Sequence, residues 1–472
     1  MKKILYIIIL LGLASCTKVL DKNPEASFAT SNFYVTSADA VAAINAVYNP
    51  LISQNIYNQI MWAFQDQSTD DAEWGNGRNT ANQAKNDLDK YTFTPSTVYF
   101  YAFWTTCYKA INLANTAIDR IPGINMDEAL KNRLIGEAKF MRGFYYFTLV
   151  RLFGPVPLVT TPTVDLQKLQ VPRTSVDSVY QQIIQDFQQA ADALPEQYTG
   201  EDLGRATKGA AISFLSSVYL TTKQWKLASD RAKEVISMET KGIYGLWDNY
   251  ADVFAIKNKN GKESVFDVQA LGGGFGLGSY MQGYMRATFD NRGYGDDPPT
   301  KDLYDAYASN DIRRTVNLKL YDRSVAPASV LFPCYVYKYQ DPNATANAEG
   351  SNNFPIFRYA EVLLIYAEAL NEQGAGNQEA YDAIDRIRSR AGLDPLPRSL
   401  SQEDFRDSVL KERRLELAFE GHRRYDLIRT GRLVAALKKQ NPAIKVQAFQ
   451  TLFPIPQDER DANPLLTQNE GY

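Results

Sequence analysis

The sequence of 472 residues has one histidine, His422, and nearly balanced charge, with 51 Lys+Arg against 54 Asp+Glu. One histidine excludes a multi-histidine zinc site and an H-E-x-x-H helix, and any Ser-His-Asp triad would have to use His422. The near-neutral charge gives no reason to expect a nucleic-acid partner. No apolar run approaches the roughly 20 residues that a spanning helix needs. These gaps exclude many enzyme classes and a membrane-spanning body.

Cysteine is also scarce, with Cys16, Cys107 and Cys334 in the whole chain. Three cysteines do not make a disulfide framework. Cys107 and Cys334 are expected to be small buried apolar side chains, although they could pair in an oxidising compartment.

The N-terminus has the pattern of a lipoprotein signal. Lys2 and Lys3 precede an apolar run over residues 4–14, too short to span a bilayer, and the sequence Leu-Ala-Ser then leads into Cys16. This resembles a bacterial lipobox, so residues 1–15 are predicted to be a signal peptide and Cys16 the lipidation site. Acyl chains such as palmitate would then anchor the protein stably. The alternative is a plain secretory signal with an incidental cysteine.

Helical periodicity dominates the first two hundred residues. Apolar residues recur at spacings of three and four over 130–152, ending at Gly154-Pro155, and again over 176–194. Residues 215–235 match the small-residue pattern of a tetratricopeptide helix pair, and residues 360–387 form a second such pair. The predicted fold is mostly α, a tetratricopeptide-like helical-repeat scaffold.

Two loop-rich insertions interrupt this scaffold. Residues 66–95 are polar, and residues 241–355 are rich in Gly, Asn, Asp, Pro and Tyr, with short alternating runs at 264–269 and 334–339 that predict a few small strands. We therefore expect an N-terminal helical region over 16–240 and a C-terminal region over 241–472 that ends in closing helices. Long aromatic, Gly/Asn-rich loops on a rigid scaffold are typical of a binding protein. The glycine run at 272–278 lacks the context of a phosphate loop and favours a flexible lid.

Several blocks resemble the SusD/RagB family of outer-membrane nutrient-binding lipoproteins. They are the lipobox, residues 137–147 (EAKFMRGFYYF) and 152–157 (LFGPVP), 358–369 (RYAEVLLIYAEA), 387–393, 412–431 (ERRLELAFEGHRRYDLIRTG), 453–456 (FPIP) and 463–469 (NPLLTQN). The resemblance implies a SusD-like fold. It also implies a lipid-anchored protein of the outer membrane that faces outward, captures oligosaccharide and delivers it to a SusC-like, TonB-dependent β-barrel transporter. Glu470 replaces a proline that the family often has near its C-terminus.

The expected cargo leaves alternatives open. The first alternative is a protein that acts as a lid of the same kind of transporter but itself binds peptide or another nutrient. The second, less favoured alternative is a glycoside hydrolase. No catalytic residue, metal site or cofactor is predicted. The acidic residues of the two insertions, among them Asp66, Asp70, Asp296 and Asp297, are expected to lie in solvated loops. They lack the rigid, dry setting that paired glycosidase carboxyls need.

Trp74 is the most informative aromatic residue, because it lies in a polar loop with no periodicity to bury it. A ring face packs on sugar C–H bonds while neighbouring polar groups bind hydroxyls. The alternative is a loop anchor tucked against the body. The resembling blocks do not cover the loops, so these ligand residues are predictions from chemistry. The predicted glycan-binding residues are Asp71, Trp74, Asn76, Arg78, Tyr280 and Tyr284.

The charged residues of the strong blocks are expected to be structural, as buried or half-buried ion pairs between packed helices. His422 is expected to cap or pack. The predicted ion-pair residues are Arg142, Arg413, Arg414, Glu416, Glu420 and Asp426.

Overall fold

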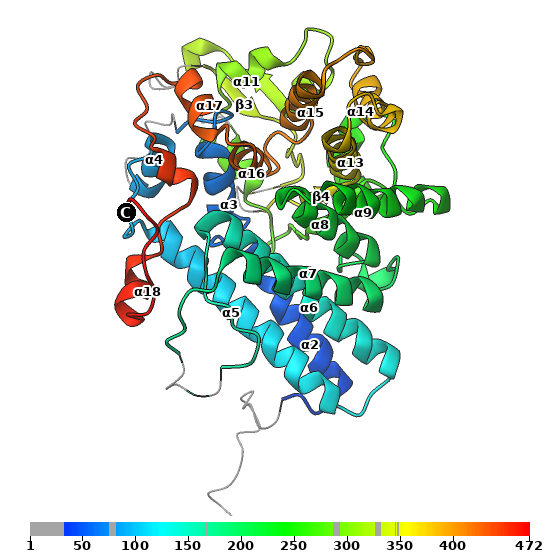
Figure 1. The fold of residues 1–472 in the computed structure, drawn as a ribbon, viewed down its shortest axis with the longest axis vertical. Coiled ribbons are helices and arrows are strands. Elements are labelled where there is room, and N and C mark those ends of the chain that lie inside the picture. Colours follow the sequence, from blue (N-terminus) through cyan, green and yellow to red (C-terminus); the bar gives the residue numbers. More distant parts are fainter. Residues whose placement is uncertain are drawn as a thin grey trace, which may run out of the picture.

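The computed structural model describes residues 33–74, 82–163, 165, 169–286, 293–325, 332–344, 346 and 349–472. Within these ranges helices dominate, and the sheets are two pairs of short strands. In Figure 1 the long helices α5 and α6 run side by side in the lower half, with the C-terminal helices α13 to α17 above them. None of the helices described is long and apolar enough to cross a membrane.

The first helix described, α2, begins at Ser37, close to the start of the described residues. The N-terminal helices are α2 (Ser37–Tyr48), α3 (Ile60–Trp62), α4 (Gln83–Lys90), α5 (Val98–Arg120), α6 (Glu128–Phe153), α7 (Val176–Ala193), α8 (Lys208–Thr221) and α9 (Trp225–Ser237). The C-terminal helices are α10 (Met281–Met285), α11 (Lys301–Ala306), α12 (Arg313–Asn317), α13 (Tyr359–Gln373), α14 (Gln378–Arg390), α15 (Gln402–Glu416), α16 (Arg423–Arg429), α17 (Leu433–Gln440) and α18 (Gln457–Ala462). The strands are β1 (Ser264–Val268), β2 (Leu318–Leu320), β3 (Cys334–Val336) and β4 (Phe354–Arg358).

Helix α6 shows how local sequence sets an element. Asp127 caps its first turn by accepting a hydrogen bond from the Leu130 amide at 2.8 Å. The helix ends where Gly154 takes φ +72°, a left-handed conformation that glycine adopts without cost. Its last four turns are buried on nearly every side. The predicted helix over 130–152 is therefore confirmed, with its end at the predicted Gly154-Pro155.

The two predicted tetratricopeptide-like pairs are also confirmed as packed helix pairs. Helices α8 and α9 contact each other, as do α13 and α14, and α13 packs directly on α9. Ala228 and Ala232 are 0% exposed, so their small side chains lie where the helix backbones approach closely. The two pairs thus form one stack, although more than a hundred residues of chain separate them.

Both strand pairs are antiparallel. Strand β1 pairs with β4, with Ser264 opposite Arg358 and an irregular register on both sides of Phe266, and β2 pairs with β3, with Leu318 opposite Val336. The predicted strands at 264–269 and 334–339 are confirmed, each one to three residues shorter than expected. Cys334 and Cys107 are buried free thiols, which confirms their expected packing role.

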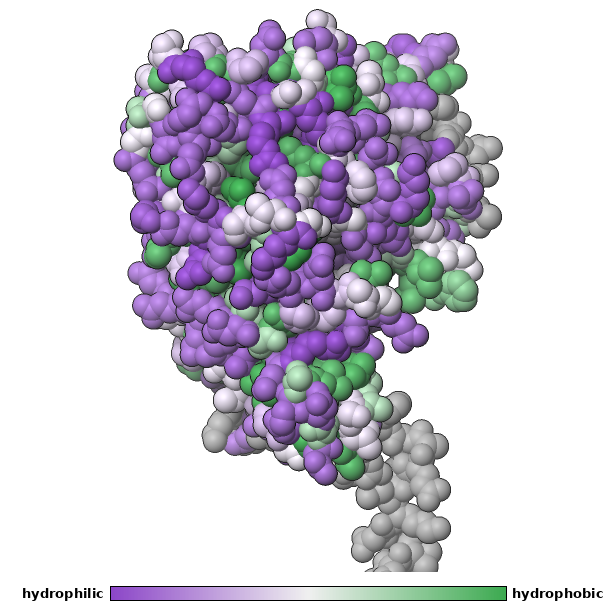
Figure 2. All heavy atoms as spheres, turned by 90° about the vertical axis from the view of Figure 1, so that its right-hand side faces the viewer, coloured by the Kyte–Doolittle hydropathy of each residue, from purple (hydrophilic) through white to green (hydrophobic). Residues whose placement is uncertain are grey.

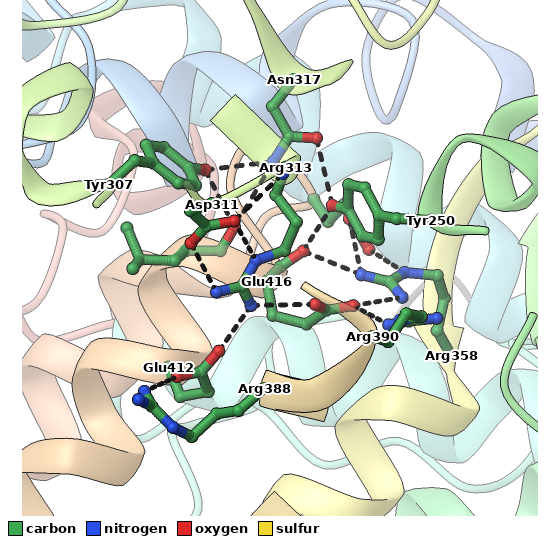
Figure 3. Close-up of polar contacts among 12 residues, drawn as sticks. Tyr250, Tyr307, Asp311, Arg313, Asn317, Arg358, Arg388, Arg390, Glu412 and Glu416 are labelled. Carbon is green, nitrogen blue, oxygen red and sulfur yellow. Dashed lines mark hydrogen bonds and ion pairs between the residues drawn. The ribbon is translucent and has the colours of Figure 1, made fainter. Parts of the chain in front are cut away.

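A buried network of ion pairs lies between the C-terminal helices, as Figure 3 shows. Glu416 lies between Arg313 on one side and Arg358 and Arg390 on the other, with N–O distances of 3.1, 3.1 and 2.5 Å. Although burial opposes it, the charges of Arg390, Arg358 and Arg313 hold the pKa of Glu416 down to about 2.

The other predicted ion pairs are confirmed as well. Arg142 pairs with Asp186 at 2.7 Å and Arg413 with Asp426 at 2.7 Å, all of them buried. His422 packs as expected. Its Nδ1 lies 3.3 Å from Glu361 Oε1, and burial lowers its pKa, so the imidazole is mainly neutral at pH 7.

The face turned toward the viewer in Figure 2, the side of α9 and α14, is mainly hydrophilic, with hydrophobic residues in small scattered groups. Apolar residues scattered in this way are normal on a protein surface.

Candidate functional site

Aromatic side chains from the two insertions meet at one place. The rings of Trp62, Trp74 and Tyr284 surround the Lys85 ammonium group, with Nζ 4.7, 5.2 and 4.6 Å from their centroids. Trp74 belongs to the first insertion and Tyr284 to the second. The structure thus brings together two of the predicted site residues through a lysine that the sequence analysis did not select.

Three tyrosines continue the cluster outward. The rings of Tyr280 and Tyr284 are 6.0 Å apart and nearly parallel, at 22°, and Tyr294 lies 5.3 Å beyond Tyr284 at 36°. Tyr280, Tyr284 and Trp74 are half-buried, and Tyr294 is 45% exposed. We call Trp74, Tyr280, Tyr284 and Tyr294 the aromatic platform. Its ring faces suit the C–H faces of sugars, and its phenol hydroxyls suit hydrogen bonds.

Lys85 is held in place from α4 and from the second insertion. Asn82 caps α4 by accepting a hydrogen bond from the Lys85 amide at 3.4 Å. Lys85 Nζ forms an ion pair with Asp296 at 2.6 Å, and the lysine is 1% exposed. Burial lowers the pKa of Lys85, while the charges of Asp296 and Asp297 oppose that shift.

Backbone hydrogen bonds hold the two insertions side by side next to the platform residue Trp74. The Glu73 amide donates to Pro298 O at 3.1 Å, and the Thr300 amide donates to Asp71 O at 2.9 Å. The second insertion folds back on α10, where the Asp296 amide donates to Tyr284 O at 2.8 Å. A π-helical turn, Ala63–Gln67, follows Trp62 directly and leads into the first insertion. Such turns occur often at functional sites.

Asp71 does not join the platform. It is 1% exposed, and its Oδ1 accepts from Arg414 Nε at 2.6 Å. Asp70 is 4% exposed and accepts two hydrogen bonds from Arg423, at 2.9 and 2.8 Å. The C-terminal helices thus supply the cationic partners of these buried carboxylates.

The expectation of solvated acidic loops is wrong for most of these carboxylates. Asp66, Asp296 and Asp297 are 1%, 6% and 0% exposed. Burial raises the pKa of Asp297 well above its usual value, reinforced by the charge of Asp66. Among the described residues, no group of three or more His, Cys, Asp or Glu side chains is arranged to hold a metal ion.

Three predicted residues lie outside the part of the chain that the structure describes: Asn76, Arg78 and Cys16. Tyr294 and Lys85 are the site residues that the sequence analysis missed. Tyr294 stands between Gly293 and Gly295 ahead of two aspartates, a context much like that of Trp74, so the same argument could have found it. Lys85 carries no such signal, since a lysine in a polar helix normally faces solvent.

The glycine run at 272–278 lies next to this platform in sequence. Leu271 bridges Leu277, and Glu349 Oε2 accepts from the amides of Gly273 and Gly274 at 3.0 and 2.5 Å. Phe275 at its tip is 69% exposed. The flexible lid stays a prediction.

Comparisons with known proteins match both ends of the chain. A family model described as "Starch-binding associating with outer membrane" matches residues 18–220, and one described as "SusD family" matches residues 323–472. SusD-like protein P2 of Formosa agariphila is 30% identical over 100% of this chain and 99% of its own length. The chain belongs to the SusD family.

More distant relatives of this SusD-family protein agree. The starch-binding protein SusD of Bacteroides thetaiotaomicron is 22% identical and covers 88% of this chain and 83% of its own. A solved structure described as a laminarin binding SusD-like protein has a TM-score of 0.80 at 26% identity, covering 93% of this chain and 100% of that one. The predicted family and mostly helical fold are confirmed. Tyr280, Tyr284 and Tyr294 fall between the two matched segments, so the family models do not cover most of the platform.

Proposed function

We propose that this SusD-family protein binds an oligosaccharide on the aromatic platform. The observation that carries the proposal is the grouping of Trp74, Tyr280, Tyr284 and the 45% exposed Tyr294 at the meeting point of two loop insertions. Stacking on ring faces and hydrogen bonds to hydroxyls would give a Kd on the order of 10 µM to 1 mM. The relatives described as binding starch and laminarin make α- and β-glucans the first ligands to test.

Binding without hydrolysis is the expected activity. Asp70, Asp71 and Asp296 are each engaged by a cationic side chain, and Asp297 is fully buried. None of these four carboxyls is thus exposed beside the platform as an acid–base pair would be. Purified protein should release no reducing ends from the glycan that it binds.

The test is isothermal titration calorimetry with laminarin, starch and other glycans on matched variants. Tyr294→Ala and Trp74→Ala should weaken binding by about tenfold or more, since each removes a stacking face. Tyr337→Ala is the control, because Tyr337 is 36% exposed and its ring contacts Tyr335 of β3 and Lys319 of β2. Equal affinities for Tyr294→Ala and Tyr337→Ala would remove the platform from the site. If no glycan binds the wild type, peptide cargo becomes the reading to test.

We further propose that the protein is anchored through Cys16 in the outer membrane, faces outward, and delivers its ligand to a SusC-like TonB-dependent β-barrel. The lipobox sequence and the family model whose description names the outer membrane support this. Labelling with a palmitate analogue should mark the wild type and not Cys16→Ala. Gentle solubilisation of native membranes should recover a large β-barrel in near-stoichiometric amount, and recovery of the lipoprotein alone would contradict the transporter role.

A further inference from the structure

Lys85 occupies an unusual position for a lysine, buried under three aromatic rings at the boundary between the two insertions. It is 1% exposed, and its ammonium lies within 5.2 Å of the rings of Trp62, Trp74 and Tyr284. A cation within about 6 Å of a ring face is attracted by the ring quadrupole, most strongly where water is absent. Since Trp74 and Tyr284 come from different insertions, this one group attracts both halves of the platform.

The ion pair with Asp296 adds a second link. Asp296 lies in the second insertion, 2.6 Å from Lys85 Nζ, and its own amide is bonded to Tyr284 O at 2.8 Å. Its backbone carbonyl accepts from Gln67 Nε2 at 2.5 Å, which ties it to the first insertion. The Asp296 carboxylate offsets the free-energy cost of burying the Lys85 ammonium, so the positive charge remains beside the aromatic rings that it attracts.

Backbone hydrogen bonds anchor the chain at Trp74. The amide of Glu73 donates to Pro298 O, which holds the chain one residue before Trp74. The backbone of Trp74 itself forms a hydrogen bond to Asp89, a residue of α4. The indole ring lies 5.2 Å from Lys85 Nζ, so the buried ammonium attracts the ring as well.

We propose that Lys85 is a positioning residue that holds Trp74 and Tyr284 in a fixed relative arrangement, so that the platform is preorganised for its glycan. The inference rests on the proposed function and deepens it. A preorganised site binds more tightly because its side chains lose less freedom on binding. Without the ammonium, the rings are no longer drawn together, and the backbone bonds of the two insertions still form but open more often.

The decisive variant is the double substitution Lys85→Met with Asp296→Asn. Lys85→Met alone leaves the Asp296 carboxylate buried and unpaired, so a loss of folding would say nothing about the platform. The double variant removes both charges and keeps both shapes. We expect a melting temperature close to that of the wild type and an affinity for the best glycan of the panel lowered about tenfold or more. Wild-type affinity in the double variant would overturn the proposal.

Lys338→Met is the matched control. Lys338 is also buried, pairs with Glu420 at 2.7 Å, and lies 4.5 Å from the Phe254 ring, but it does not touch the platform. It should lower the melting temperature without changing glycan affinity. If Lys338→Met weakens binding as much as the double variant does, the effect of Lys85 is one of general stability and the proposal fails.

Hydrogen exchange provides a readout that needs no ligand. The amides of Glu73 and Asp296 report on the two insertions, because each donates to a defined carbonyl, Pro298 O and Tyr284 O. In the double variant both should exchange faster, while α5 and α6 are unchanged. If the wild type binds no glycan, the proposed function fails, yet exchange still decides the role of Lys85. Unchanged exchange in both insertions would overturn it.

Discussion

Replacing Arg358 by Met should destabilise the protein more than any comparable change at a surface arginine. Arg358 is 1% exposed and donates to three carboxylates, with N–O distances of 2.6 Å to Glu263, 3.1 Å to Glu416 and 2.6 Å to Glu420. Methionine fills the space of the side-chain stem but carries no charge. The substitution thus leaves three buried acids with one cation fewer.

The size of the expected destabilisation follows from the ion pairs that remain in Arg358→Met. Glu263 and Glu416 still contact Arg390, and Glu420 still contacts Lys338, so no carboxylate is left without a cation. Removing one member of a buried ion pair costs about 3–5 kcal/mol, and here the loss arises because the remaining cations no longer balance the buried negative charge that they share. We expect a loss of about that size in the free energy of unfolding.

The assay is urea denaturation of Arg358→Met beside Arg386→Met. Arg386 pairs with Glu239 at 2.5 Å, but the two side chains are 36% and 38% exposed. An exposed pair contributes at most about 1 kcal/mol, because solvent screens it. The midpoint for Arg358→Met should therefore fall several times further at an unchanged m-value. Losses below about 1 kcal/mol in both variants would refute the argument that burial gives the network its stabilising effect.

Three further predictions concern groups away from the platform. Burial raises the pKa of Asp267 from 3.8 to about 6, so the folded state favours the protonated carboxyl. The free energy of unfolding of the wild type should therefore fall by on the order of 3 kcal/mol as pH rises from about 4 through about 6. The melting temperature of Asp267→Asn should fall less over that range, and parallel curves of melting temperature against pH would contradict this. Gly136→Ala should cost about 1–3 kcal/mol, since the new Cβ would lie 2.8 Å from Ala193 Cβ, whereas at Gly123 a Cβ meets nothing within 4 Å and Gly123→Ala should be near neutral in calorimetry. The buried thiol of Cys107, whose pKa burial raises, should react with a thiol reagent only after unfolding, and rapid labelling of the folded protein would show that it is accessible.

The helical scaffold could be predicted from the chain because its signals are local. The stripe over 130–152, the cap at Asp127 and the stop at Gly154 lie within one helix, and the structure has α6 there. The small residues over 215–235 likewise predict a packed helix pair, and α8 and α9 form that pair. Trp74 could be selected because its polar, aperiodic surroundings offer no local reason for burial.

The acidic loop shows where such reasoning stops. Asp70 and Asp71 are surrounded in sequence by polar residues, which favours a solvated loop, yet both are buried. Their partners, Arg423 and Arg414, follow more than 340 residues later, so the pairing exists only after the C-terminal helices have packed. A carboxylate is buried when a cation meets it in space, and no local pattern encodes that meeting.

For the aromatic platform, too, the sequence specifies one part and the packing of the chain specifies the other. The residue types and the loops that carry them can be seen in the sequence, and they predict Trp74, Tyr280 and Tyr284 as site residues. Their convergence depends on Lys85, which is unremarkable in a polar helix and acquires its role only when α4, α10 and the Asp296 loop come together around it. Periodicity and capping act between residues a few positions apart, so the chain itself specifies its helices. Stacking and ion pairing act between residues brought together by packing, so only the tertiary structure specifies the site.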